Sequence, residues 1–82
     1  MSVRAVIGDI FAQVAIEQQR TLAQLSDNAK LIELGLDSLS FALVVAGLED
    51  TFGFDPIRAL DQFPVTFGEF VELYEAYPLS HQ

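Results

Sequence analysis

The chain has 82 residues, of which 51% are hydrophobic and 20% are charged. This length predicts a single domain over residues 1–82, and this composition excludes an intrinsically disordered chain. The absence of cysteine excludes disulfides, thiolate metal sites and a protein thiol nucleophile. Twelve acidic and four basic residues leave a net charge of −8, so nucleic acid and anionic membranes are poor partners and we expect partners with basic patches.

No segment of the sequence is typical of membrane insertion or export. The longest nearly apolar run, residues 39–48, is about half of a membrane span. Asp9 interrupts the apolar stretch that a signal peptide would need near the N-terminus. We therefore expect the protein to reside in the cytoplasm. A monomer is also expected. The remaining acids do not match the spacing of a calcium loop, so no metal site is expected.

Apolar residues at helical spacing predict a first helix that begins after Ser2, a capping residue, and ends in the polar run 17–20. Its apolar positions are Val3, Val6, Ile7, Ile10, Phe11 and Val14. A long connection over residues 20–37 follows, and its length with five leucines along it suggests both that it is functional and that it is tied to the core. They are Leu22, Leu25, Leu31, Leu34 and Leu36.

A second helix is predicted over residues 38–52, with Asp37 as its N-cap and Gly53 at its C-terminal end. Pro56 prevents its continuation, and residues 57–61 could form one short turn. The spacing of residues in this helix predicts two faces. One points inward, and the other is a stripe that lies beside Ser38. The inward set is Phe41, Val44, Val45, Leu48 and Phe52, and the other stripe holds Leu39, Ala42, Leu43, Ala46, Glu49 and Asp50.

The last helix is predicted to start at Thr66, where Glu69 can complete a capping box, and Pro78 bars its extension. Its apolar stripe holds Phe67, Phe70, Val71 and Tyr74, and we expect the phenylalanines at 54, 63, 67 and 70 to pack in the core. No stretch of four or more residues alternates as a strand would. The prediction is an all-α fold, a small antiparallel four-helix bundle of three main helices plus a short third helix.

Ser38 is the candidate for chemistry, and three roles can be compared. A serine at a helix start usually satisfies free N–H groups. A hydrolase nucleophile is excluded, because the glycines of the G-x-S-x-G elbow are absent and the single histidine, His81, is remote in sequence. As an attachment point for a phosphodiester, the hydroxyl would place negative charge at a helix N-terminus, which the helix dipole favours.

The segment Leu34-Gly35-Leu36-Asp37-Ser38-Leu39 resembles the L-G-x-D-S-L motif of acyl carrier proteins and related peptidyl carrier domains. Residues 48–52 look like the L-E-E-x-F helix end of that family, and Thr66-Phe67 resembles the start of its final helix. The resemblance covers the chain from about Val3 to Tyr77. It implies that Ser38, preceded by Asp37, receives 4′-phosphopantetheine from coenzyme A and that the arm carries acyl or aminoacyl cargo as thioesters.

The family role implies a carrier that is not an enzyme, since a transferase attaches the arm and other enzymes load and process the cargo. Expected partners are a phosphopantetheinyl transferase, an acyl- or aminoacyl-loading ligase, and downstream synthases or transferases. The resemblance favours docking through Leu39, Leu43, Ala46, Glu49 and Asp50. Many fatty-acid carriers have an acid where this chain has Leu43, which favours a specialised biosynthetic pathway over general fatty-acid synthesis. The alternative is an unmodified helical module for protein–protein interaction.

Overall fold

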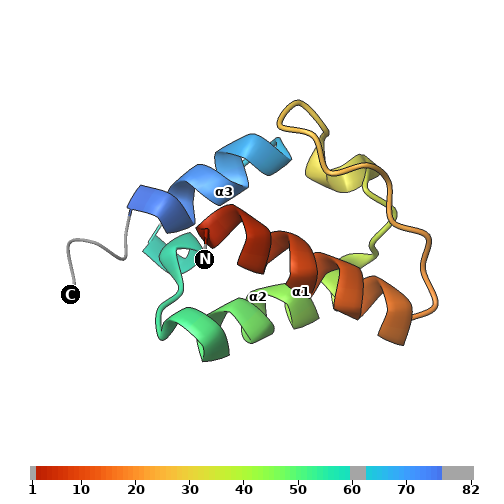
Figure 1. Cartoon of the computed structure of the whole chain (residues 1–82), viewed down its shortest axis with the longest axis horizontal. Coiled ribbons are helices and arrows are strands. Elements are labelled where there is room, and N and C mark those ends of the chain that lie inside the picture. The colour runs from red at the N-terminus through yellow and green to blue at the C-terminus, as the bar shows by residue number, and fades with distance from the viewer. Residues whose placement is uncertain (1, 60–62, 77–82) are drawn as a thin grey trace.

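The computed structural model describes residues 2–59 and 63–76, and they form three α-helices around one hydrophobic core (Figure 1). Figure 1 shows α1 running in the opposite direction to α2 and α3. This arrangement confirms the predicted all-α fold, with a short 3-10 helix, η2, where the short third helix was expected. In chain order the elements are α1 (Val3–Glu17), η1 (Leu31–Glu33), α2 (Ser38–Phe52), η2 (Pro56–Ala59) and α3 (Phe67–Ala76).

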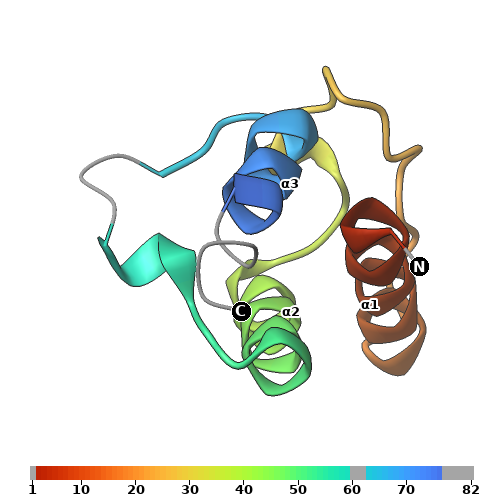
Figure 2. The ribbon, with the colours of Figure 1, turned by 60° about the vertical axis from the view of Figure 1, so that its left-hand side comes forward.

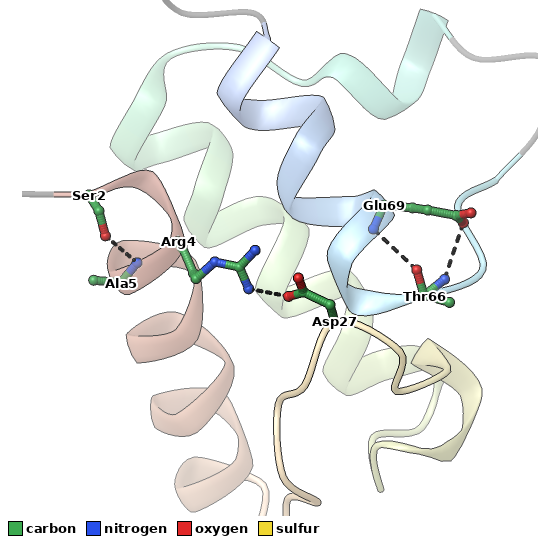
Figure 3. Close-up of polar contacts among 6 residues, drawn as sticks. All are labelled: Ser2, Arg4, Ala5, Asp27, Thr66 and Glu69. Carbon is green, nitrogen blue, oxygen red and sulfur yellow. Dashed lines mark hydrogen bonds and ion pairs between the residues drawn. The ribbon is translucent and has the colours of Figure 1, made fainter.

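Helix α1 begins as the sequence predicts, because the Ser2 hydroxyl accepts a hydrogen bond from the backbone N–H of Ala5 at 3.0 Å (Figure 3). It packs against both α2 and α3. In Figure 2 the three helices are seen nearly end-on and surround a common centre. The side chains that α1 buries there are Ile7, Phe11, Val14 and Ala15.

Helix α2 has the predicted bounds and the predicted inward face. Gly53 ends it in the left-handed conformation with φ of 83°, and its N–H donates to the Glu49 carbonyl at 2.7 Å. Val44 and Leu48 are buried, while Phe41, Val45 and Phe52 are half-buried. The structure also buries Ser40 completely, which was not predicted. The most deeply buried line of the helix is therefore Ser40, Val44 and Leu48, at intervals of four residues.

Helix α3 starts with the predicted capping box (Figure 3). The N–H of Glu69 donates to Thr66 Oγ1 at 3.2 Å, and the N–H of Thr66 donates to Glu69 Oε1 at 3.3 Å. All four residues of its predicted stripe are buried, namely Phe67, Phe70, Val71 and Tyr74. Helix α3 ends at Ala76, and Pro78 lies outside the described residues.

Aromatic rings form the centre of the core. Phe11 meets Phe67 and Phe70 edge to face, with ring centroids 5.4 and 5.7 Å apart, which is a favoured geometry for aromatic pairs. Phe54 is half-buried, and its ring lies 5.9 Å from that of Tyr74. The prediction that Phe63 packs in the core is wrong. Its side chain is 53% exposed, because it lies on the outer side of Phe41, at a centroid distance of 5.4 Å, rather than inside the helices.

The long connection before α2 is tied to the core, as its leucines indicated. Leu31 and Leu34 are buried, and Leu22, Leu25 and Leu36 pack against the core. The backbone N–H of Leu31 donates to the Val65 carbonyl at 2.9 Å. Within residues 2–59 and 63–76 the β-type pairing is limited to one isolated bridge between Lys30 and Thr66.

The start of α3 also meets this connection. The N–H groups of Phe67 and Gly68 donate to the carbonyls of Ala29 and Asp27, at 2.8 and 3.0 Å. Arg4 of α1 binds the carboxylate of Asp27 at 2.5 Å, which joins the connection to α1 (Figure 3). In the part of the chain that the structure describes, no helix has both the length and the apolar character that crossing a membrane requires.

Candidate functional site

The start of α2 presents Ser38 to solvent and fixes the backbone around it. Asp37 is the N-cap, with φ of −85° and ψ of 179°, and its Oδ1 accepts a hydrogen bond from the Ser40 N–H at 2.8 Å. Ser38 follows as the first helical residue and is exposed, whereas Ser40 is fully buried. The Asp37 side chain therefore satisfies a free N–H of the helix start, as predicted, and leaves the Ser38 hydroxyl accessible.

The Asp37 carboxylate has a second partner that the sequence did not suggest. Its Oδ2 binds the guanidinium of Arg20, and both side chains are a little over 40% exposed. The pKa of Asp37 lies below its ordinary value of 3.8. The first cause is the Ser40 hydroxyl, which lies beside the carboxylate without a hydrogen bond of standard geometry, followed by the Ser40 N–H and, to a smaller extent, Arg20. A charged Asp37 therefore stands next to Ser38 at neutral pH.

An apolar groove opens beside Ser38. Its volume is about 250 Å³, and apolar side chains supply most of its wall. Ile32 is 88% exposed and Phe63 is 53% exposed, so the groove is open to solvent. The lining residues are Leu31, Ile32, Leu36, Asp37, Ser38, Phe41 and Phe63.

The residues predicted for partner recognition all lie on the surface of α2. Leu39 is 61% exposed and Leu43 is 38% exposed, and Ala46, Glu49 and Asp50 are exposed as well. We call these five residues the α2 strip. The structure confirms that the α2 strip is accessible, as the prediction of two helix faces requires.

The α2 strip borders a second groove, between α1 and α2, with a volume of about 310 Å³. Its lining combines apolar residues with one carboxylate from each helix, Glu17 of α1 and Asp50 of α2. A Cβ atom on Gly47 would lie 3.3 Å from Ile10 Cγ2, so glycine permits the close approach of the two helices here. The lining residues are Ile10, Gln13, Val14, Glu17, Leu43, Gly47, Asp50 and Thr51.

The arrangement around Ser38 suits attachment rather than catalysis. A serine hydroxyl becomes a strong nucleophile only with a base beside it. Within the described part of the chain, the residues that bind Asp37 or line the groove include no imidazole or amine base. Among the described residues, no cluster of three or more metal-ligating side chains is present. The site can hold a group covalently at Ser38, and it can place that group between a charged pair and an apolar groove.

Sequence reasoning singled out Ser38, Asp37 and the α2 strip, but it did not point to Arg20 or to the groove residues Ile32 and Phe63. Arg20 lies seventeen residues before Asp37, and nothing in a single sequence pairs charges at that distance. For the groove a signal was present, since Ile32 is an apolar residue between two leucines that the core uses.

Comparison with known families agrees with this geometry. The family model for the phosphopantetheine attachment site matches residues 5–67, which cover most of α1, the long connection, α2 and the chain up to the first residue of α3. No curated protein and no solved structure matches the chain significantly. The family match decides between the two interpretations of the sequence in favour of the carrier over the unmodified interaction module.

Carrier domains of this family are not enzymes. They bear 4′-phosphopantetheine as a prosthetic group, and the family implies a phosphopantetheinyl transferase and loading enzymes as partners. The chain belongs to the phosphopantetheine attachment site family and is a non-catalytic, phosphopantetheine-carrying carrier domain.

Proposed function

We propose that residues 1–82 form one carrier domain that holds its arm on Ser38 and presents acyl or aminoacyl cargo to the enzymes of a specialised biosynthetic pathway. The observation that carries the assignment is the contrast between Ser38 and Ser40. Ser38 is exposed at the start of α2, while Ser40, two residues later, is fully buried beneath the same turn. A transferase can reach the first hydroxyl and not the second.

The residues around Ser38 fit a phosphopantetheine group. A phosphodiester on Ser38 would stand at the N-terminus of a 15-residue helix, where free N–H groups and the dipole favour an anion. The groove along Leu36, Phe41 and Phe63 offers apolar walls beside the attachment point. When bound, the group supplies the thiol that the cysteine-free chain lacks and holds cargo there as a thioester.

The protein's own contribution is to position the arm. Asp37 fixes the first turn of α2 through the Ser40 N–H, so the Ser38 oxygen has a defined place relative to the helix. The buried leucines of the connection, Leu31 and Leu34, hold the segment that leads into this turn. A rigid attachment point lets partner enzymes find the arm by docking on nearby surface, and such positioning needs no catalytic residue.

The α2 strip is the docking surface in this proposal. Its apolar part, Leu39 and Leu43, would contact a partner directly, and its acids, Glu49 and Asp50, would orient a basic patch and raise the association rate. The groove shared with α1 supports an extension of this surface, because Glu17 of α1 places a further carboxylate on its rim. Leu43, where many fatty-acid carriers have an acid, supports a dedicated partner in a specialised pathway.

Further features of the proposal come from the sequence. A net charge of −8 suits partners with basic patches and disfavours both nucleic acid and anionic membrane surfaces. We propose that the domain works in the cytoplasm as a monomer. The partners are the transferase, an acyl- or aminoacyl-loading ligase and the synthases or transferases that use the cargo.

A thiol titration tests the proposal with no background, because the chain contains no cysteine. The purified protein would be incubated with coenzyme A and a broad-specificity phosphopantetheinyl transferase, then separated from small thiols. We expect one thiol per chain after the reaction, none before it, and none in the Ser38→Ala variant. A wild-type protein that gains no thiol, or a Ser38→Ala protein that gains one, would contradict the proposal.

A further inference from the structure

Asp37, the residue before the attachment serine, binds a cation through its carboxylate. Its Oδ1 caps α2 through the Ser40 N–H, and its Oδ2 binds the Arg20 guanidinium. Ser38 is the next residue in the chain, so a phosphodiester on its oxygen would stand close to this ion pair. An anion that arrives beside a carboxylate is repelled, whereas an anion beside an arginine is attracted. Whether the phosphodiester is repelled or attracted at this place therefore depends on the position of the Arg20 guanidinium.

Arg20 has a backbone held at the end of α1 and a partly exposed side chain. Its N–H donates to the Ala15 carbonyl at 2.7 Å, at the end of α1, and Gln19 before it has φ of 57°. The side chain of Arg20 is 43% exposed, so part of it is accessible to solvent. A tethered, half-exposed arginine can shift between two neighbouring anions without a change in the fold.

This acidic chain has few basic side chains that could bind a phosphodiester. It has four basic residues. Among the residues that the structure describes, Arg4 is the other arginine in an ion pair, and it binds Asp27 in the connection before α2. Arg4 therefore resembles Arg20 in its chemistry, with one exposed aspartate partner each, but its partner is Asp27 rather than Asp37. This similarity makes Arg4 a matched control for Arg20.

We propose that Arg20 binds the phosphodiester of the attached arm, with its guanidinium shared between that phosphodiester and Asp37. The planar guanidinium has five N–H donors and can serve two anions at once. The contact would orient the first atoms of the arm at the end of α2 and offset the repulsion between the phosphodiester and Asp37. This inference rests on the proposed attachment at Ser38.

The test compares the effect of modification on thermal stability in three proteins: the wild type, Arg20→Gln and Arg4→Gln. For each, the melting temperature of the unmodified form is subtracted from that of the modified form, which cancels any direct effect of the substitution. We expect this difference to be lower in Arg20→Gln than in the wild type by about 2–4 °C, the size of an exposed charge contact in a small domain. Arg4→Gln should match the wild type.

A second measurement needs no variant and guards against a failure of Arg20→Gln to fold. In the ¹⁵N-labelled wild-type protein, the Nε–H resonance of Arg20 should move on modification while that of Arg4 stays in place. Peptide mapping identifies the residue that carries the arm. An arm absent from Ser38 would overturn the proposed function and this inference together. An arm on Ser38, with an unmoved Arg20 resonance and equal stability differences in all three proteins, would overturn this inference alone.

Discussion

Gly35 and Thr21 approach so closely that a Cβ atom on Gly35 would lie 2.2 Å from the Thr21 carbonyl oxygen. Gly35 also has φ of 99°, a conformation that other residues rarely adopt. Two parts of the long connection therefore cross three residues before Ser38 at a point where only glycine fits. The glycine of the carrier motif is explained here by this crossing, which sets the path of the chain into α2.

Gly35→Ala should destabilise the protein much more than Gly53→Ala. Both positions have φ in the left-handed region, and that strain costs about 1–2 kcal/mol for a residue with a Cβ. A Cβ atom on Gly53 would meet no atom within 4 Å, while one on Gly35 adds the clash with Thr21. We expect a loss of about 3 kcal/mol or more at Gly35 against about 1 kcal/mol at Gly53, measured by urea unfolding. Equal losses would show that the crossing relaxes freely.

The contribution of Asp37 to stability should depend on pH. Its pKa is lower in the folded protein than its ordinary value of 3.8, so the folded state favours the ionised form. That stabilisation is fully present above pH 3.8 and is lost as the pH falls through the lower, folded pKa. The Asp37→Asn variant keeps an acceptor for the Ser40 N–H but loses the charge.

We therefore expect the melting temperature of the wild type to exceed that of Asp37→Asn at pH 7. This difference should shrink as the pH falls below about 3.8. A difference that stays constant from pH 7 to pH 2 would contradict the charge-based account, leaving capping geometry as the sole role of Asp37 in stability.

Tyr74→Phe should leave the protein equally stable or make it more stable. The Tyr74 side chain is fully buried, and its hydroxyl has no hydrogen-bond partner among the residues that the structure describes. Burial also raises the pKa of this hydroxyl, so it stays neutral. An unsatisfied buried hydroxyl costs about 1–3 kcal/mol, and its removal keeps the ring contacts with Phe70 and Phe54.

The control for the ring is Tyr74→Ala, which should cost about 3–5 kcal/mol of unfolding free energy, as large-to-small core substitutions do. Both variants would be measured by urea unfolding at neutral pH. If Tyr74→Phe lost more than about 1 kcal/mol, the hydroxyl would have to make a stabilising hydrogen bond.

Much of the fold follows from local signals in the sequence. The capping serine at position 2, the capping box of Thr66 and Glu69, and Gly53 each act within four residues, and all three were predicted and confirmed. The buried stripe of α3 was also predicted, because its spacing matches a helical face. Such signals depend only on the near neighbours of each residue.

The contacts that the sequence did not predict join residues far apart in the chain. Arg20 reaches Asp37 across seventeen residues, and Gly35 meets Thr21 across a crossing of the connection. Phe63 was expected inside the core because aromatic residues are usually buried, but it instead covers Phe41 from outside and helps to form the groove. Ser40 is buried because the inward face of α2 is centred on Val44 and Leu48, four and eight residues beyond it.

Charge reversal on the α2 strip should slow modification by a basic transferase. Changing Glu49 and Asp50 together to lysine should reduce kcat/KM mainly through the association rate, and the defect should shrink as salt rises. The control changes Glu72 and Glu75 of α3 to lysine, an equal charge change on exposed residues outside the α2 strip. Equal defects in the two double variants would point to net charge rather than to the α2 strip.

Leu43→Glu tests the apolar part of the same surface. A dedicated partner that buries Leu43 should bind the variant more weakly by about 1 kcal/mol, because the side chain is already partly covered. This defect should depend little on salt, unlike that of the Glu49 and Asp50 variant. Affinity for the loading enzyme at two salt concentrations would separate the two effects. An unchanged affinity would remove Leu43 from the docking surface.

The most direct test of the central claim is the intact mass of three proteins after reaction with coenzyme A and the transferase: the wild type, Ser38→Ala and Ser40→Ala. Ser40 is a matched control, since it lies two residues away in the same helix but is fully buried. We predict that the wild type and Ser40→Ala each gain one phosphopantetheine and that Ser38→Ala gains none. A modified Ser38→Ala protein, or an unmodified but folded Ser40→Ala protein, would contradict the assignment of Ser38.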